Sequence, residues 1–121
     1  MTLTFQYLAP KSNGDMAIAG RGLRVYTILG EYEMGMSAEA IAENAEIPVA
    51  AVYEALAYAA EHPDEMEAIS RADDEAYIAW INALPDEPLR QAAQHGLETA
   101  KRDREEAVRK AKEARRSTPV P

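Results

Sequence analysis

The segment LRVYTILGEYEMGMSAEAIAENAEIPVAAVYEALAYAAEH, residues 23–62, contains three helical patterns separated by two short breaks. In the first pattern the apolar residues recur three or four positions apart, as they do on one face of a helix: Val25, Ile28, Leu29 and Tyr32. Gly35 follows them and suits a left-handed cap. This spacing predicts a first helix that starts near Leu23 and ends at Gly35.

Ser37 indicates the start of a second helix. Serine is a favoured N-cap, and Glu39 lies in the first turn, where a negative charge complements the helix dipole. Asn44 suits a C-terminal cap, so we expect this helix to be short and to span about 38–44.

Pro48 suits the first turn of a third helix, expected at about 48–61. A helix, a turn of a few residues and another helix form the outline of a helix-turn-helix unit, with 48–61 as the candidate recognition helix. Many three-helix folds share this outline, so the spacing alone leaves DNA binding open.

The residues before this segment favour a short β arm. Leu3, Phe5 and Tyr7 alternate, residues 10–15 form a turn-rich cluster, and residues 16–19 allow a second extended piece. We expect the two pieces to pair as a hairpin.

A fourth helix is expected after the break at His62 and Pro63. Asp64, Glu65 and Glu67 open it, since acidic residues belong in a first turn. Its apolar stripe comprises Met66, Ile69, Tyr77, Ile78 and Ile81.

The prolines at 85 and 88 indicate a linker over residues 84–88, because both cannot lie inside a helix. Residues 88–116 then read as one long helix with a thin apolar stripe, and residues 117–121 as a disordered tail. The predicted fold is mainly α, with a helix-turn-helix domain at 1–84 and a partner-binding helical extension with its tail at 85–121.

Charge is unevenly distributed along the 121 residues. The net charge is −8, yet residues 101–116 hold eight basic and four acidic residues and therefore carry +4. The remaining −12 counts against tight nonspecific binding of nucleic acid by the body of the protein and suits a basic partner.

Several classes of function are disfavoured by what the sequence lacks. It has no cysteine and two histidines, which leaves no convincing zinc site and no nucleophile–base pair. We therefore expect no enzyme activity and no cofactor. With no export signal and no apolar run of membrane-spanning length, we expect a cytoplasmic protein.

Three motifs in order resemble the DUF433 family of small prokaryotic proteins. They are Gly20-Arg21-Gly22-Leu23-Arg24-Val25, Gly35-Met36-Ser37-Ala38-Glu39-Ala40-Ile41-Ala42 and Val52-Tyr53-Glu54-Ala55-Leu56-Ala57-Tyr58, the last followed by His62 and Glu65. The family's arginine in the first motif falls at Gly22 here, so Arg21 or Arg24 would replace it.

The resemblance implies a homeodomain-like helix-turn-helix module in a VapB-like antitoxin of a type II toxin–antitoxin system. Such a protein forms a homodimer, binds operator DNA of its own promoter and inhibits a PIN-like nuclease toxin. The residues expected at DNA are Arg21, Arg24, Ser37 and Tyr53. Those expected at the toxin are Leu89, Leu97, Arg109, Lys112, Arg115 and Arg116.

Some of these residues also have explanations that involve no ligand or partner. The arginines of residues 101–116 also suit a solubilising tail, and Tyr53 and Tyr58 are expected mainly as core residues. The candidate recognition helix contains no Lys, Arg, Asn or Gln, the side chains that usually read bases. A protein-interaction or assembly module with a helix-turn-helix fold and no DNA binding is therefore the alternative function.

Overall fold

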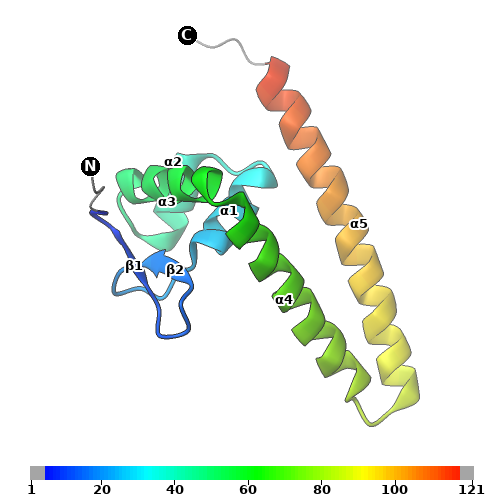
Figure 1. Ribbon diagram of the computed structural model, residues 1–121. Coiled ribbons are helices and arrows are strands. Elements are labelled where there is room, and N and C mark those ends of the chain that lie inside the picture. Colours follow the sequence, from blue (N-terminus) through cyan, green and yellow to red (C-terminus); the bar gives the residue numbers. More distant parts are fainter. Residues whose placement is uncertain (1–4, 118–121) are drawn as a thin grey trace. The chain divides into compact units, whose positions relative to one another are not determined.

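A computed structural model describes residues 5–117 and is mainly helical, which confirms the expected fold class (Figure 1). Two compact units, residues 1–66 and 67–121, divide the chain. The elements are β1 (Leu8–Pro10), β2 (Met16–Ile18), α1 (Val25–Glu33), α2 (Ala38–Ala45), α3 (Val49–Glu61), α4 (Pro63–Asn82) and α5 (Glu87–Ser117).

The first unit is built on three helices that pack on one another, with α3 against both α1 and α2. Its core is small because many of the buried side chains are alanines: the buried residues of α3 are Ala51, Val52, Ala55, Tyr58 and Ala59. Val25 and Ile28 of α1 and Ile41 of α2 supply much of the remaining apolar volume. Burial of these branched side chains is the main stabilising term for the unit.

The end of α1 is a Schellman motif, as Gly35 predicted. Gly35 adopts a φ of 111° and donates its N–H to Tyr32 O at 3.0 Å, and Met36 N–H reaches Glu31 O at 3.1 Å. The predicted N-cap of α2 is also confirmed, because Ser37 Oγ accepts a hydrogen bond from Ala40 N–H at 3.1 Å.

The expected cap at Asn44 is wrong. Asn44 lies inside α2, and the helix is capped by Glu46, which adopts the left-handed conformation with φ 57° and ψ 48°. Pro48 likewise stands one residue before α3, at the N-cap position, and not in its first turn. The turn between the two helices therefore consists of Glu46, Ile47 and Pro48, with Ile47 buried.

The predicted hairpin is present but lies further along the chain than the alternation indicated. β1 and β2 are antiparallel, with Leu8 opposite Ile18 and Pro10 opposite Met16. Phe5 and Tyr7 precede β1, and Leu3 lies outside the described residues. The register brings Leu8, Ala17 and Ile18 into the core, where the sheet packs on α3.

The second unit is an antiparallel pair of helices, the larger part of α4 and all of α5, joined by residues 83–86 (Figure 1). Pro88 is accommodated in the first turn of α5, so this helix starts one residue earlier than expected. Ser117, expected in the tail, is helical, and residues 118–121 lie outside the described residues. The expected domain boundary after residue 84 falls in the turn between the two helices.

Candidate functional site

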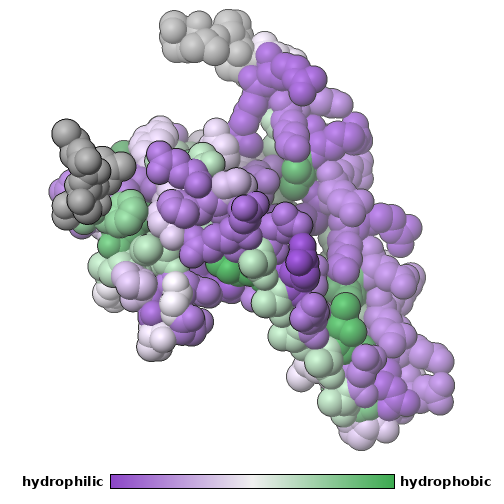
Figure 2. Space-filling view, in the orientation of Figure 1, coloured by the Kyte–Doolittle hydropathy of each residue, from purple (hydrophilic) through white to green (hydrophobic). Residues whose placement is uncertain are grey.

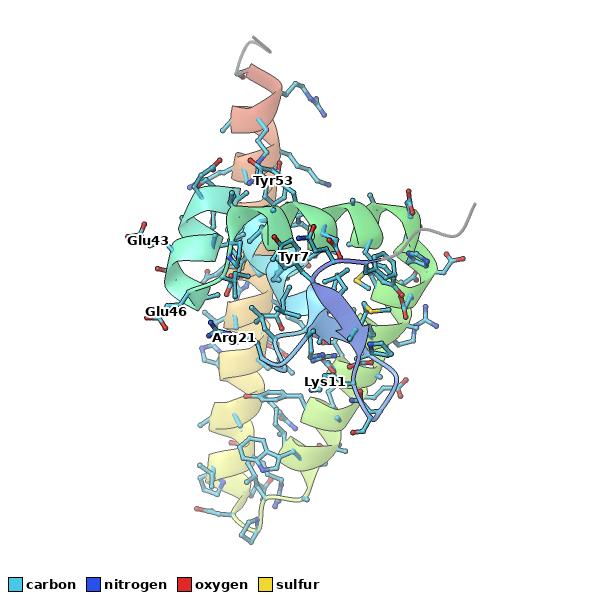
Figure 3. The ribbon with its side chains drawn as sticks, turned by 90° about the vertical axis from the view of Figure 1, so that its left-hand side faces the viewer. Tyr7, Lys11, Arg21, Glu43, Glu46 and Tyr53 are labelled. Atoms are coloured by element: carbon cyan, nitrogen blue, oxygen red, sulfur yellow. The ribbon has the colours of Figure 1, made fainter. Side chains whose placement is uncertain are left out.

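An arginine of the loop between β2 and α1 holds the α2–α3 turn. Arg21 donates a hydrogen bond from Nη2 to the backbone oxygen of Glu46 at 2.8 Å. This contact places a positive charge at the C-terminal end of α2, where the helix dipole favours it. Figure 3 shows Arg21 beside Glu46, with Glu43 and Glu46 directed away from the core.

Tyr53 is the main exposed side chain of α3, with 52 % of its surface accessible. Its hydroxyl donates to Glu39 Oε1 of α2 at 3.1 Å. The hydrogen bond to Glu39, followed by the charge of that carboxylate, raises the pKa of Tyr53. The hydroxyl of Tyr53, which is labelled in Figure 3, is thus engaged within the chain.

The rest of the exposed face of α3 is apolar. Glu54, half-buried, is turned toward the N-terminal arm, where its Oε1 accepts hydrogen bonds from the N–H groups of Tyr7 at 3.1 Å and Leu8 at 3.3 Å. The positions left exposed along the middle of the helix are Val49, Ala50, Tyr53, Ala57 and Ala60. Such a face offers few hydrogen-bond donors for base edges.

Arg24 and Ser37 have structural partners in the first unit. Arg24 Nε lies 3.1 Å from Asp15 Oδ2, and its guanidinium lies 5.4 Å from the centre of the Tyr26 ring. Ser37 caps α2. Each of the four residues expected at DNA therefore has a partner within the first unit.

Tyr58 is a core residue, as expected, whereas Tyr53 is not. The Tyr58 ring stacks on His62 at 4.0 Å between ring centres and meets the edge of Phe5 at 5.6 Å. Burial, with a hydrogen bond to Glu65, raises the pKa of Tyr58 to about 12. Nδ1 of His62 lies 2.8 Å from the Tyr58 carbonyl oxygen, so this histidine closes α3 before Pro63 as predicted.

The residues expected at the toxin are spread along α5. Leu89 is 49 % exposed near its start, and Leu97 is half-buried. Near its end, Arg109 pairs with Glu113 at 3.4 Å and Lys110 with Glu106 at 3.2 Å, both one helical turn apart. Lys112 and Arg116 are exposed and Arg115 is half-buried, and these cations complement the helix dipole in the last turns.

The second unit also carries an exposed apolar surface on α4, which includes Trp80, a residue for which the sequence predicted no role. Tyr77, Ile78 and Trp80 are 45 %, 43 % and 57 % exposed, and the first two belong to the expected apolar stripe of this helix. We call Tyr77 and Trp80, whose rings contact each other, the α4 patch. In Figure 2 residues of hydrophobic colour follow α4, whereas most of the visible surface of α5 is hydrophilic. The signal available in the sequence was Trp80, the single tryptophan of the chain.

A groove of about 240 Å³ separates the two helices of this unit beside the α4 patch. Ile78 and Ile81 line it from α4 and Leu97 from α5, together with the polar residues Asn82, Gln94, Glu98 and Lys101. Among residues 67–117 only Ile81 and Ala111 are buried. The unit therefore has almost no core of its own.

Residues 5–117 contain no group of three or more His, Cys, Asp or Glu side chains placed to hold a metal ion. Within the same residues no helix combines the length and the apolar character needed to cross a membrane.

Residues 11–59 match the DUF433 family model. The family is described as "Protein of unknown function (DUF433)". The matched segment contains β2, α1, α2 and most of α3, and it agrees with the resemblance drawn from the three motifs. No curated protein and no solved structure matches the chain. The α4 patch and α5 lie outside the matched residues.

Proposed function

We propose that the protein is the antitoxin of a type II toxin–antitoxin pair and that it inhibits a PIN-like ribonuclease through α5. The observation that carries the proposal is the exposure of this helix. It extends over 31 residues, of which Ala111 alone is buried, and ends in basic turns. An isolated helix with so little packing gains its stability from a partner.

The basic side chains in the last turns of α5 suit contact with an acidic active site. Arg109, Lys112, Arg115 and Arg116 present cations within eight residues. An arginine fork binds carboxylates bidentately and stays charged at every physiological pH. A metal-dependent nuclease of the PIN-like class holds its metal with carboxylates, so these side chains match the surface that they would block.

The test is co-purification of the full chain with the PIN-like product of the neighbouring gene, together with an assay of its ribonuclease activity. We expect the double substitution Arg115→Glu and Arg116→Glu to weaken inhibition by at least tenfold. The matched control is Lys101→Glu with Arg102→Glu, which makes the same charge change on the same helix and should leave inhibition within about twofold. Equal inhibition by both double variants would contradict the assignment to the last turns.

The alternative is an assembly module that binds protein and no DNA, and the exposed face of α3 favours it. That face is apolar between Val49 and Ala60 apart from the Tyr53 hydroxyl. Two acidic side chains of α2 are also exposed, Glu43 and Glu39, the latter bonded to Tyr53. These carboxylates would repel the DNA phosphates, and the face offers few hydrogen-bond donors to the bases. A gel-shift assay with the promoter of its own operon separates the two functions, since salt-sensitive binding supports the antitoxin with promoter control and no shift at low salt supports the assembly module.

A further inference from the structure

The apolar surface of α4 is wider than one neighbouring helix can cover. Ile78 and Ile81 line the groove shared with α5. Successive residues of a helix are rotated by about 100°, so Trp80 lies roughly 160° from Ile78 around the axis. A helix packed against the isoleucines therefore leaves Trp80 uncovered.

The exposure of α4 follows this geometry. Every residue from Arg71 to Trp80 is exposed, although the stretch contains two large aromatic rings. The rings of Tyr77 and Trp80 contact each other at 5.7 Å between centres and form one continuous apolar surface. Exposed aromatic clusters of this kind mark protein–protein interfaces, because single scattered apolar residues do not bury enough area.

The charges of the two helices identify a suitable occupant. α4 contains six acidic residues and one basic residue, a net charge of −5, whereas α5 contains nine basic and six acidic residues, a net charge of +3. Another copy of α5 is therefore attracted to α4, and another copy of α4 is repelled. A second copy of the chain supplies the attractive helix.

The shape of α5 agrees with this pairing. Ala92, Gly96 and Ala100 lie four residues apart and are all exposed, and a Cβ atom added at Gly96 would meet no atom within 4 Å. Large aromatic side chains on one helix pack closely against small residues on its neighbour.

We propose that the α4–α5 hairpins of two copies pair to form a four-helix bundle, in which the α4 patch of each copy packs against α5 of the other. The interface encloses Trp80 in both copies and leaves the basic last turns of α5 outside the apolar contact. It does not depend on the proposed inhibition of a nuclease, since the protein alone forms it.

The full chain tests the proposal without a partner. Light scattering after size exclusion should give twice the chain mass of 13.3 kDa at tens of micromolar. Trp80 is the single tryptophan, so its fluorescence reports on this surface alone. We expect its emission to shift to the red on dilution, in parallel with the fall in mass. A monomer at every concentration, or emission that stays red while the mass doubles, would overturn the proposal.

Three variants locate the contact. Trp80→Glu should raise the dimer dissociation constant by at least 100-fold. Val49→Glu, at another exposed apolar site, on α3, should change it by less than threefold. Gly96→Gln improves the helix propensity of α5 and so cannot weaken the dimer by unfolding the helix. We nevertheless expect it to raise the dissociation constant by at least tenfold. A dimer lost with Val49→Glu and kept with Trp80→Glu would assign the interface to α3.

Discussion

The hydroxyl of Tyr53 on α3 is bound to Oε1 of Glu39 on α2 at 3.1 Å, so the two helices of the helix-turn-helix are joined by the side chain that the sequence marked for an external ligand. An external ligand must compete with Glu39 for this donor. Removal of the carboxylate should therefore free the hydroxyl without disturbing the buried core.

We expect Glu39→Gln to lower the pKa of Tyr53 toward its ordinary value. The pKa is raised mainly by the hydrogen bond and the charge that Glu39 supplies, and the amide removes the charge. Ultraviolet or NMR titration of Tyr53 measures this change. Glu43→Gln, on the same helix and one turn further on, is the control and should leave the titration of Tyr53 unchanged.

The protein should lose stability in alkali because of Tyr58. Its pKa is about 12 in the folded chain against an ordinary value of 10.0, so the unfolded chain releases this proton first. The contribution is complete below pH 10 and is lost as the pH rises from about 10 through 12. Denaturant unfolding at a series of pH values checks this. In Tyr58→Phe the decline over this range should be shallower, and an unchanged decline would show that other groups cause it.

Glu46→Gly should stabilise the first unit by about 0.5–1 kcal/mol, because Glu46 holds a left-handed conformation that glycine adopts without steric cost. The measurement is the free energy of unfolding in urea. The matched control is the neighbouring Ala45→Gly, inside α2, which should destabilise by roughly 1 kcal/mol. Loss of stability in both variants would mean that the Glu46 side chain contributes more than its backbone strain costs.

We expect Glu54 to stabilise the N-terminal arm at Tyr7 and Leu8. Its carboxylate accepts the N–H groups of Tyr7 and Leu8, so Glu54→Ala leaves both donors without this acceptor. We expect amide hydrogen exchange at these two residues to quicken by at least tenfold. Glu61→Ala, at the exposed end of the same helix, should have no effect there. Equal protection in wild type and Glu54→Ala would show that the β1–β2 pairing alone holds the arm.

Ile41→Ala should cost about 2–5 kcal/mol of stability. The side chain is 1 % exposed in a core where many of the buried residues are alanines, so its removal leaves a cavity that these small neighbours cannot fill. Val49→Ala, at a 38 % exposed position, should cost less than about 1 kcal/mol and serves as the control. Thermal unfolding of the two variants compares them directly.

The helix ends of the first unit could be predicted from the sequence where the signal is local. Gly35 and Ser37 each satisfy backbone groups within a few residues of themselves, so their types alone indicate the ends of α1 and the start of α2. Glu46 was missed because its left-handed conformation is supported by Arg21, 25 positions away. The residue pattern of α2 gives no indication of that contact.

The two tyrosines of α3 show the same division between local and long-range information. Tyr53 and Tyr58 are five residues apart, which places them about 140° apart around the helix, so both cannot face one core. The choice between them depends on the positions of α1 and the hairpin. Trp80 was not assigned a role because the exposure of a side chain depends on how the other elements are arranged, which a helical periodicity does not indicate.

The length of α5 determines how large a partner must be. Leu89 and Arg115 are 26 residues apart, and a rise of 1.5 Å per residue separates them by about 39 Å. That distance exceeds the width of a small folded domain, so a protein that touches both residues is held across its whole breadth. The free energy of binding is then distributed over many helical turns of α5. A short peptide copied from either end would then compete poorly with the intact helix.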